Sequence, residues 1–150
     1  MTILTKGMPL GPLTIEAVPA SGMKLAAALL DDPNPIHLDP RAVETLGLGT
    51  TVINQGPITI SYLQSMIAAA LGGAERIMRF EARFLANVFA GDRLVCTGTV
   101  DDDGEVTGIA ILSCQAAVND VTVATAIAAV RLTDSKAPTG GTLTMTARTA

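Results

Sequence analysis

The feature that most constrains the fold is a stretch without charge between Glu44 and Glu75. It contains an apolar segment, ITISYLQSMIAAAL at residues 58–71, that is opened by Gly56 and Pro57 and followed by two glycines. Proline suits the first turn of a helix and glycine suits the left-handed residue beyond its end. Asparagine and glutamine interrupt the stretch, so it lacks the run of about 20 apolar residues that crosses a bilayer. We predict a helix that is buried on all sides.

Beyond this helix the pattern changes to a period of two. Arg79, Glu81 and Arg83 face one way, while Phe80, Ala82 and Phe84 face the other. Short polar turns separate the later segments and favour antiparallel neighbours. The predicted strands are residues 13–18, the segment around Arg79, and residues 93–100, 106–118 and 121–132. The fold class is therefore α+β, with an antiparallel sheet of about five strands wrapped around one long central helix.

The length of 150 residues fits a single domain with a sizeable core. We expect this domain to span residues 1–134, and we expect residues 135–150, which have little to bury, to form a disordered tail. Hydrophobic residues make up 49% of the chain and charged residues only 16%. A monomer of this composition would leave much apolar surface in water, which favours an oligomer.

The charge balance bears on partners and location. There are 14 acidic against 10 basic residues and no basic run, which argues against nucleic acid and anionic membranes as partners. The first residues lack the basic and apolar regions of a signal peptide, so we expect a cytoplasmic protein. Cys96 and Cys114 fall in apolar strand-like segments, and we expect buried free thiols. No metal site and no cofactor are predicted.

The only histidine of the chain lies in the segment DDPNPIHLDP, residues 31–40. In one interpretation this segment only links two helices. Ser21 would cap the first helix, which would end at Asp32 because Pro33 disfavours helical geometry before it. Asp39 and Pro40 would open the second helix, which would end near Gly47. Proline and aspartate are common in such turns.

The alternative interpretation is chemical. Proline restricts its own backbone and that of the preceding residue, so Asp32, Asn34 and His37 have few conformations available. A carboxylate and an imidazole on such a bent loop could face one cavity and hold a water molecule between them. Histidine exchanges protons near neutral pH, and positioned acid-base groups typically supply about 10² to 10⁴ in rate.

The segment D-P-N-P-I-H-L-D resembles the signature of the MaoC-like dehydratases, the (R)-specific enoyl-CoA hydratases, whose loop reads D-x-N-P-x-H-x-D. The similarity extends to Ala42, Gly47 and Gly56, and to RFLANVFAGDRL at residues 83–94, which resembles the family's R-F-x-x-P-V-x-x-G-D-x-L. The resemblance covers most of residues 5–133. It implies the hot-dog fold, a curved antiparallel sheet around one long helix, and a homodimer or a dimer-based oligomer.

The resemblance also implies roles for individual residues. Asp32 and His37 would be the catalytic pair, and Asn34 would shape the loop or position the pair. Gly56 would offer its backbone N–H to the thioester carbonyl oxygen, a role that the positive end of a helix dipole also favours. Ser61 matches a serine of the family, although a helical serine is more often structural.

Two positions depart from the family pattern. The family commonly has histidine before the glycine that opens the helix, and this chain has Gln55; it usually has glycine before the catalytic aspartate, and this chain has Asp31. Both changes touch the wall of the implied pocket, so Gln55 joins Asn34, Gly56 and Ser61 as a candidate substrate-binding residue.

The implied activity is addition of water to a trans-2-enoyl thioester, or its removal from the (3R)-3-hydroxyacyl thioester. Asp32 and His37 would act on the water and the Gly56 N–H would stabilise the enolate oxygen; which of the pair is acid and which is base stays open. The thioester would be carried by CoA or a carrier protein. The candidates for contacting the phosphates are Arg76, Arg79, Arg83 and Arg93, although a solvated strand face explains each of them better.

Two other functions remain open. A non-catalytic acyl-thioester binding protein, or the silent subunit of a heterodimer, is favoured by Gln55 and opposed by the retained Asp32 and His37. A hot-dog thioesterase generally needs a carboxylate on or just before the central helix, and residues 45–74 contain none.

Overall fold

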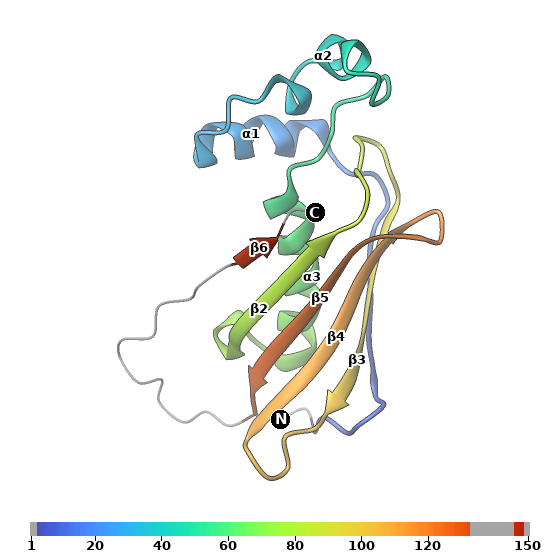
Figure 1. Cartoon of the computed structure of the whole chain (residues 1–150). Coiled ribbons are helices and arrows are strands. Elements are labelled where there is room, and N and C mark those ends of the chain that lie inside the picture. The colour runs from blue at the N-terminus through green and yellow to red at the C-terminus, as the bar shows by residue number, and fades with distance from the viewer. Residues whose placement is uncertain (1–2, 133–145, 149–150) are drawn as a thin grey trace.

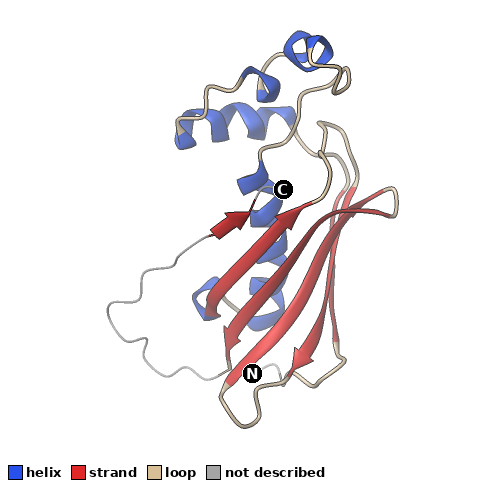
Figure 2. Cartoon of the chain, in the orientation of Figure 1, coloured by secondary structure: helices blue, strands red, loops and turns tan. Residues whose placement is uncertain are grey.

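The computed structural model describes residues 3–132 and 146–148. One curved sheet packs against a long helix, and smaller helices gather at one end (Figures 1 and 2). The strand order is β1-β3-β4-β5-β2-β6. The strands are β1 (Pro9–Ile15), β2 (Ile77–Phe84), β3 (Leu94–Asp102), β4 (Ile109–Val118), β5 (Val121–Arg131) and β6 (Thr146–Arg148). All neighbouring pairs among β1 to β5 are antiparallel, which confirms the predicted sheet of about five strands around one helix.

The central helix, α3 (Gly56–Leu71), begins and ends where the sequence predicts. Pro57 lies in its first turn, and Gly72 follows its end in the left-handed conformation with φ +82°. Ile60, Leu63 and Ile67 are buried on the side that faces the sheet. Each such side chain contributes about 1.5 to 3 kcal/mol when fully buried.

The prediction that α3 is buried on all sides was wrong. Ser61, Ser65 and Ala69 lie exposed on consecutive turns, because the sheet covers only one side of the helix. The hydroxyl of Ser61 donates to the Ile58 carbonyl and that of Ser65 to the Ser61 carbonyl, both at 2.7 Å. Because both hydroxyls donate to carbonyl oxygens of α3 itself, this side of the helix is polar enough to face solvent without charged residues.

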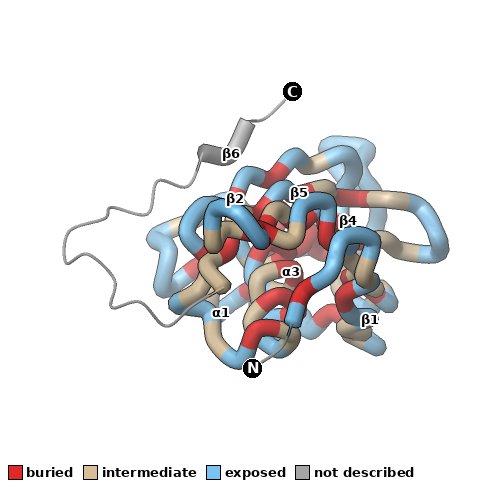
Figure 3. The backbone as a smooth tube through the Cα atoms, turned by 90° about the horizontal axis from the view of Figure 1, so that it is seen from below, coloured by how far each residue is buried: buried red, intermediate tan, exposed pale blue. Residues whose placement is uncertain are grey.

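Small side chains on the sheet allow α3 to approach it closely. Ala110, Ala116, Ala124 and Ala128 on β4 and β5 are fully buried, and Phe80 supplies bulk from β2. Figure 3 shows the buried segments concentrated between the sheet and α3. The predicted alternation along β2 is confirmed, since Arg79, Glu81 and Arg83 are exposed and Phe80 and Ala82 are buried.

The short strand β6 pairs in parallel with Glu81–Arg83 of β2, at the edge of the sheet. The predicted disordered tail, residues 135–150, otherwise lies outside the described residues, so its disorder stays a prediction. The same holds for the extent of the domain over residues 1–134.

The helices at the end of the sheet are α1 (Ala20–Leu30), the 3₁₀ turn η1 (Pro35–His37) and α2 (Pro40–Thr45). They lie beyond the N-terminal end of α3 (Figure 1). A second 3₁₀ turn, η2 (Ala74–Arg76), follows α3. None of the described helices is long and apolar enough to span a membrane.

Local boundaries in this region differ from the expected ones. The N-cap of α1 is Pro19 rather than Ser21, because the first turn forms where the Gly22 N–H donates to the Pro19 carbonyl at 3.1 Å. The first strand begins and ends earlier than the expected residues 13–18 and overlaps them at residues 13–15, because β1 pairs with β3 from Pro9 to Ile15. The capping role of Asp39 is confirmed: its carboxylate accepts from the Arg41 N–H at 2.9 Å.

Candidate active site

The loop that carries Asp32 is held by a series of tight turns. The last residue of α1 is Leu30, and Asp31 follows it in the left-handed conformation with φ +50°. Glycine adopts this left-handed conformation at the least cost, and aspartate tolerates it. Asp31 can therefore form the turn for which the family usually has glycine at this position. Asp32 Oδ1 then accepts from the Asn34 N–H at 3.2 Å, and Asn34 Oδ1 accepts from the Ile36 N–H at 3.3 Å.

His37 is held from one side by backbone and faces Asp32 with the other side. Its Nδ1 lies 2.7 Å from the carbonyl oxygen of Ile53, and its Nε2 lies 3.4 Å from Asp32 Oδ2. The Ile53 N–H donates to the Ile36 carbonyl at 2.9 Å, so the loop and residue 53 are joined twice. A carbonyl only accepts hydrogen bonds, so Nδ1 carries the proton in neutral imidazole. Nε2 is then a free base directed at the carboxylate.

This geometry predicts the tautomer of His37. When the imidazole ring is uncharged, its single N–H proton should lie on Nδ1, because the Ile53 carbonyl oxygen can only accept a hydrogen bond there. Nitrogen-15 NMR of side-chain-labelled protein measures this directly, and the chain has a single histidine, so its signal needs no assignment. A neutral ring protonated at Nε2 would contradict the observed orientation.

Gly56 lies at the same end of α3 as the Asp32–His37 pair, since Ile53, which binds His37, leads directly into the helix. Among the described residues, none accepts a hydrogen bond from the Gly56 N–H. A Cβ atom at this position would lie 2.8 Å from Cζ of Phe84 on β2. The glycine therefore allows the aromatic ring to pack against the first turn of the helix.

The other candidate residues have different settings. Gln55 is 1% exposed, and its Nε2 donates to the Met23 carbonyl of α1 at 2.8 Å. Asn34 is exposed, and its side chain caps η1, which supports a role in shaping the loop. Ser61 is exposed and its hydroxyl is used within α3.

Sequence reasoning missed two members of this site. The Ile53 carbonyl is a backbone group, and no sequence signal distinguishes it. Phe84 was assigned only to a strand face, although the glycine at position 56 indicated that something approaches closely there.

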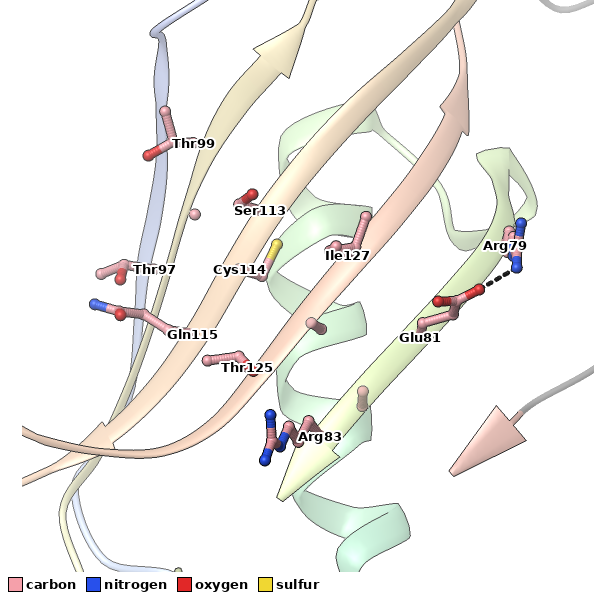
Figure 4. Close-up of a pocket in the computed structure, with 13 residues that line it drawn as sticks. Arg79, Glu81, Arg83, Thr97, Thr99, Ser113, Cys114, Gln115, Thr125 and Ile127 are labelled. Atoms are coloured by element: carbon pink, nitrogen blue, oxygen red, sulfur yellow. Dashed lines mark ion pairs between the residues drawn. The ribbon is translucent and has the colours of Figure 1, made fainter. Parts of the chain in front are cut away.

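A groove of about 1150 Å³ lies elsewhere, on the outer face of β2 to β5. Figure 4 shows α3 behind this sheet and the labelled side chains of the groove on the strands. Its lining includes Thr97, Gln115 and Thr125, but neither Asp32 nor His37. Hydroxyl and amide side chains are typical of a solvated sheet face, so we do not place the reaction there despite the size of the groove.

The four arginines do not gather at the Asp32–His37 pair. Arg79 and Arg83 line the outer groove, and Arg79 forms an ion pair with Glu81. Arg93 pairs with Glu16 at 3.0 Å, and Arg76 donates to the Leu132 carbonyl at 3.2 Å. A structural role therefore explains three of them.

The two thiols are buried and free, as predicted. Burial raises the pKa of Cys96 to about 11 and that of Cys114 to about 12, so both stay protonated at neutral pH and are poor nucleophiles. Within residues 3–132 and 146–148, no group of three histidine, cysteine or acidic side chains is placed to hold a metal ion.

Comparison with known proteins identifies the fold. The chain is similar to the (R)-hydratase from A. caviae involved in PHA biosynthesis, with 26% identity, a TM-score of 0.78, and coverage of 87% of this chain and 98% of that one. It is also similar to the R-hydratase PhaJ1 from Pseudomonas aeruginosa, with 22% identity, a TM-score of 0.74, and coverage of 85% and 81%. A search of the curated proteins found no match.

A third similar structure is the ChsH1-ChsH2 complex from Mycobacterium tuberculosis, with 14% identity, a TM-score of 0.75, and coverage of 86% of this chain and 98% of that one. These similarities confirm the hot-dog fold expected from the sequence. The model of the MaoC-like domain family matches residues 14–125, which include the loop, α3 and most of the sheet. The chain therefore belongs to the family of MaoC-like domains, whose members include hydratases and dehydratases.

Proposed function

We propose that this protein is an (R)-specific enoyl-thioester hydratase, which adds water to a trans-2-enoyl thioester to give the (3R)-3-hydroxyacyl thioester, or catalyses the reverse dehydration. The observation that carries the proposal is the approach of two basic atoms, His37 Nε2 and Asp32 Oδ2, to 3.4 Å at the loop beside the start of α3. Membership of a family that contains such enzymes supports the same reaction.

The Asp32–His37 pair is suited to hold the reacting water. With the proton of imidazole on Nδ1, both Nε2 and the ionised carboxylate are acceptors, so one water molecule can donate a hydrogen bond to each. Its oxygen lone pair is then free to attack C3 of the enoyl group. One water proton passes to His37 Nε2 as the O–C3 bond forms, and a proton from the pair reaches C2 on the same face, which completes a syn addition.

The N-terminus of α3 would stabilise the charge that develops on the substrate. As water adds to C3, negative charge accumulates on the thioester oxygen, and the Gly56 N–H is a free donor at the positive end of a helix of 16 residues. One such donor is worth about 10² to 10³ in rate. No cofactor is required, because the thioester itself accepts the electron pair.

A direct test is to mix the purified protein with a panel of trans-2-enoyl-CoA thioesters of different chain length and to follow the loss of the enoyl ultraviolet absorbance. We expect hydration of at least one short or medium substrate, with the (3R) product identified by chiral chromatography. A panel without any absorbance change, or a (3S) product, would count against the proposal.

A second candidate is a non-catalytic acyl-thioester binding protein or the silent subunit of a heterodimer, favoured by Gln55 where the family commonly has histidine. The assay separates the two: activity of the chain alone supports the hydratase, and activity only with a partner subunit supports the alternative. A thioesterase is less favoured, because residues 45–74 carry no carboxylate.

We further propose a homodimer or a dimer-based oligomer. Leucines on the helices around the loop are largely exposed, with Leu29 at 75% and Leu46 at 62%, and the outer side of α3 is uncovered in the single chain. Burial of such surface is the usual reason for association. A cytoplasmic location, CoA or a carrier protein as thioester carrier, and the absence of nucleic-acid or membrane partners remain predictions from the sequence.

A further inference from the structure

Gln55 is the least exposed polar side chain among the described residues, at 1%. Its Nε2 donates to the Met23 carbonyl at 2.8 Å, and Met23 is itself fully buried. Its Oε1 has no hydrogen-bond donor among the described residues. The orientation of the amide is fixed by this contact, because exchanging the two ends would place oxygen against the Met23 carbonyl oxygen.

Among the described residues, the hydrogen bonds of Gln55 do not account for its burial through stability. A buried acceptor without a donor costs at least as much free energy as one neutral hydrogen bond contributes. A methionine of similar length would fill the same space and avoid that cost, since it has no strong acceptor to satisfy. The side chain therefore needs another explanation, and its position supplies one.

Gln55 joins the two elements on which the proposed reaction depends. It directly precedes Gly56, whose N–H lies at the start of α3. Through Met23 it is bound to α1, and the same helix leads to Asp32, whose N–H donates to the Ala27 carbonyl at 3.0 Å. His37 is bound to Ile53, in the same short segment. Residues 53–56 are thus linked to all three proposed catalytic groups: the imidazole of His37, the carboxylate of Asp32 and the N–H of Gly56.

We propose that Gln55 is a positioning residue, whose hydrogen bond to the Met23 carbonyl fixes α1, the helix that leads to Asp32, relative to the Gly56 N–H. The inference rests on the hydratase function proposed above. It assigns Gln55 no contact with substrate and no proton transfer. Misplacement of a reacting group by about 1 Å can cost 10²-fold in rate, so loss of this anchor should act on the chemical step.

The test compares Gln55→Met with the wild-type protein. We expect kcat to fall by about 10- to 100-fold, because the Asp32 carboxylate and the Gly56 N–H are no longer held at the distance that the reaction needs. KM should stay within about threefold of the wild-type value, because the pocket that binds the substrate is intact. The melting temperature should not fall, because the unsatisfied oxygen is removed together with the hydrogen bond. Gln55→His, which restores an N–H donor, should recover a large part of kcat.

Met66→Leu is the matched control. It changes a buried side chain of α3 away from the helix start, at 2% exposure, and should leave kcat at the wild-type value. A Gln55→Met variant with wild-type kcat would overturn the inference. So would a loss of kcat that is accompanied by a large fall in melting temperature, since that is what a purely structural residue would give.

Hydrogen exchange separates this inference from the proposed function. In Gln55→Met, amides at the end of α1 and in the following loop, residues 27–34, should exchange faster, while those in the middle of α3 should not change. If the wild-type protein hydrates no thioester, the hydratase proposal fails, and faster exchange at residues 27–34 still supports the anchoring role of Gln55. Unchanged exchange there overturns it.

Discussion

Replacing Asp32 with asparagine lowers the hydration rate by roughly 10² or more, and His37→Ala does the same. Each substitution removes one of the two acceptors that face each other across 3.4 Å, so the water loses either its base or its second anchor. Asn in place of Asp32 keeps an oxygen able to accept from the Asn34 N–H, so the loop should retain its turns. Initial rates with the best substrate of the panel give the effect.

Asp39→Asn is the matched control for Asp32→Asn. It makes the same chemical change in the same loop, and asparagine caps helices as well as aspartate does. Its activity should stay near that of the wild type, and circular dichroism of all three variants should show the native fold. Wild-type activity in either Asp32→Asn or His37→Ala would show that the water is held elsewhere.

Gly56→Ala should also lower kcat by about 10²-fold, because it displaces the N–H of residue 56 without removing this donor. The added methyl group would lie 2.8 Å from Cζ of Phe84, closer than the two carbon atoms can approach, so the first turn of α3 must move. The N–H is retained but displaced from the thioester oxygen. Steady-state kinetics should show the loss mainly in kcat.

Phe84→Leu in the same chain provides the internal check. The smaller side chain gives the new methyl group room, so the double variant should recover much of the activity that Gly56→Ala loses, a coupling that a double-mutant cycle measures. Gly22→Ala is the control glycine: its Cβ would lie 3.5 Å from Pro19, an ordinary contact, and the activity should not change. A Gly56→Ala variant that Phe84→Leu fails to improve would contradict the steric explanation.

The parts of the fold that could be predicted are those whose signals are local. Gly56, Pro57 and Gly72 set the ends of α3, and Asp39 caps α2, because each acts on neighbouring backbone. The alternation along β2 was readable for the same reason. Ser21 failed as a cap because a competing turn begins at Pro19, and local preference is weak against such alternatives.

The sequence predicts which segment carries the candidate site, but it does not predict how all the side chains of the site are oriented. The prolines of the loop indicated that Asp32 and His37 are restrained, and their approach follows from turns within the same segment. The orientation of the imidazole does not follow, because it depends on Ile53, a tertiary contact. Likewise, the exposed side of α3 could not be predicted, since an uncharged sequence is compatible with full burial or with a surface of small residues.

The double connection of Ile53 to the loop has a consequence for variation at this position. In both bonds residue 53 uses main-chain atoms only: its N–H donates to the Ile36 carbonyl, and its carbonyl oxygen accepts from His37 Nδ1. Any apolar side chain that fits can therefore stand there without changing the imidazole's environment, whereas proline, which lacks the donor, is excluded. A position of this kind would vary freely between relatives, and its importance would be invisible in an alignment.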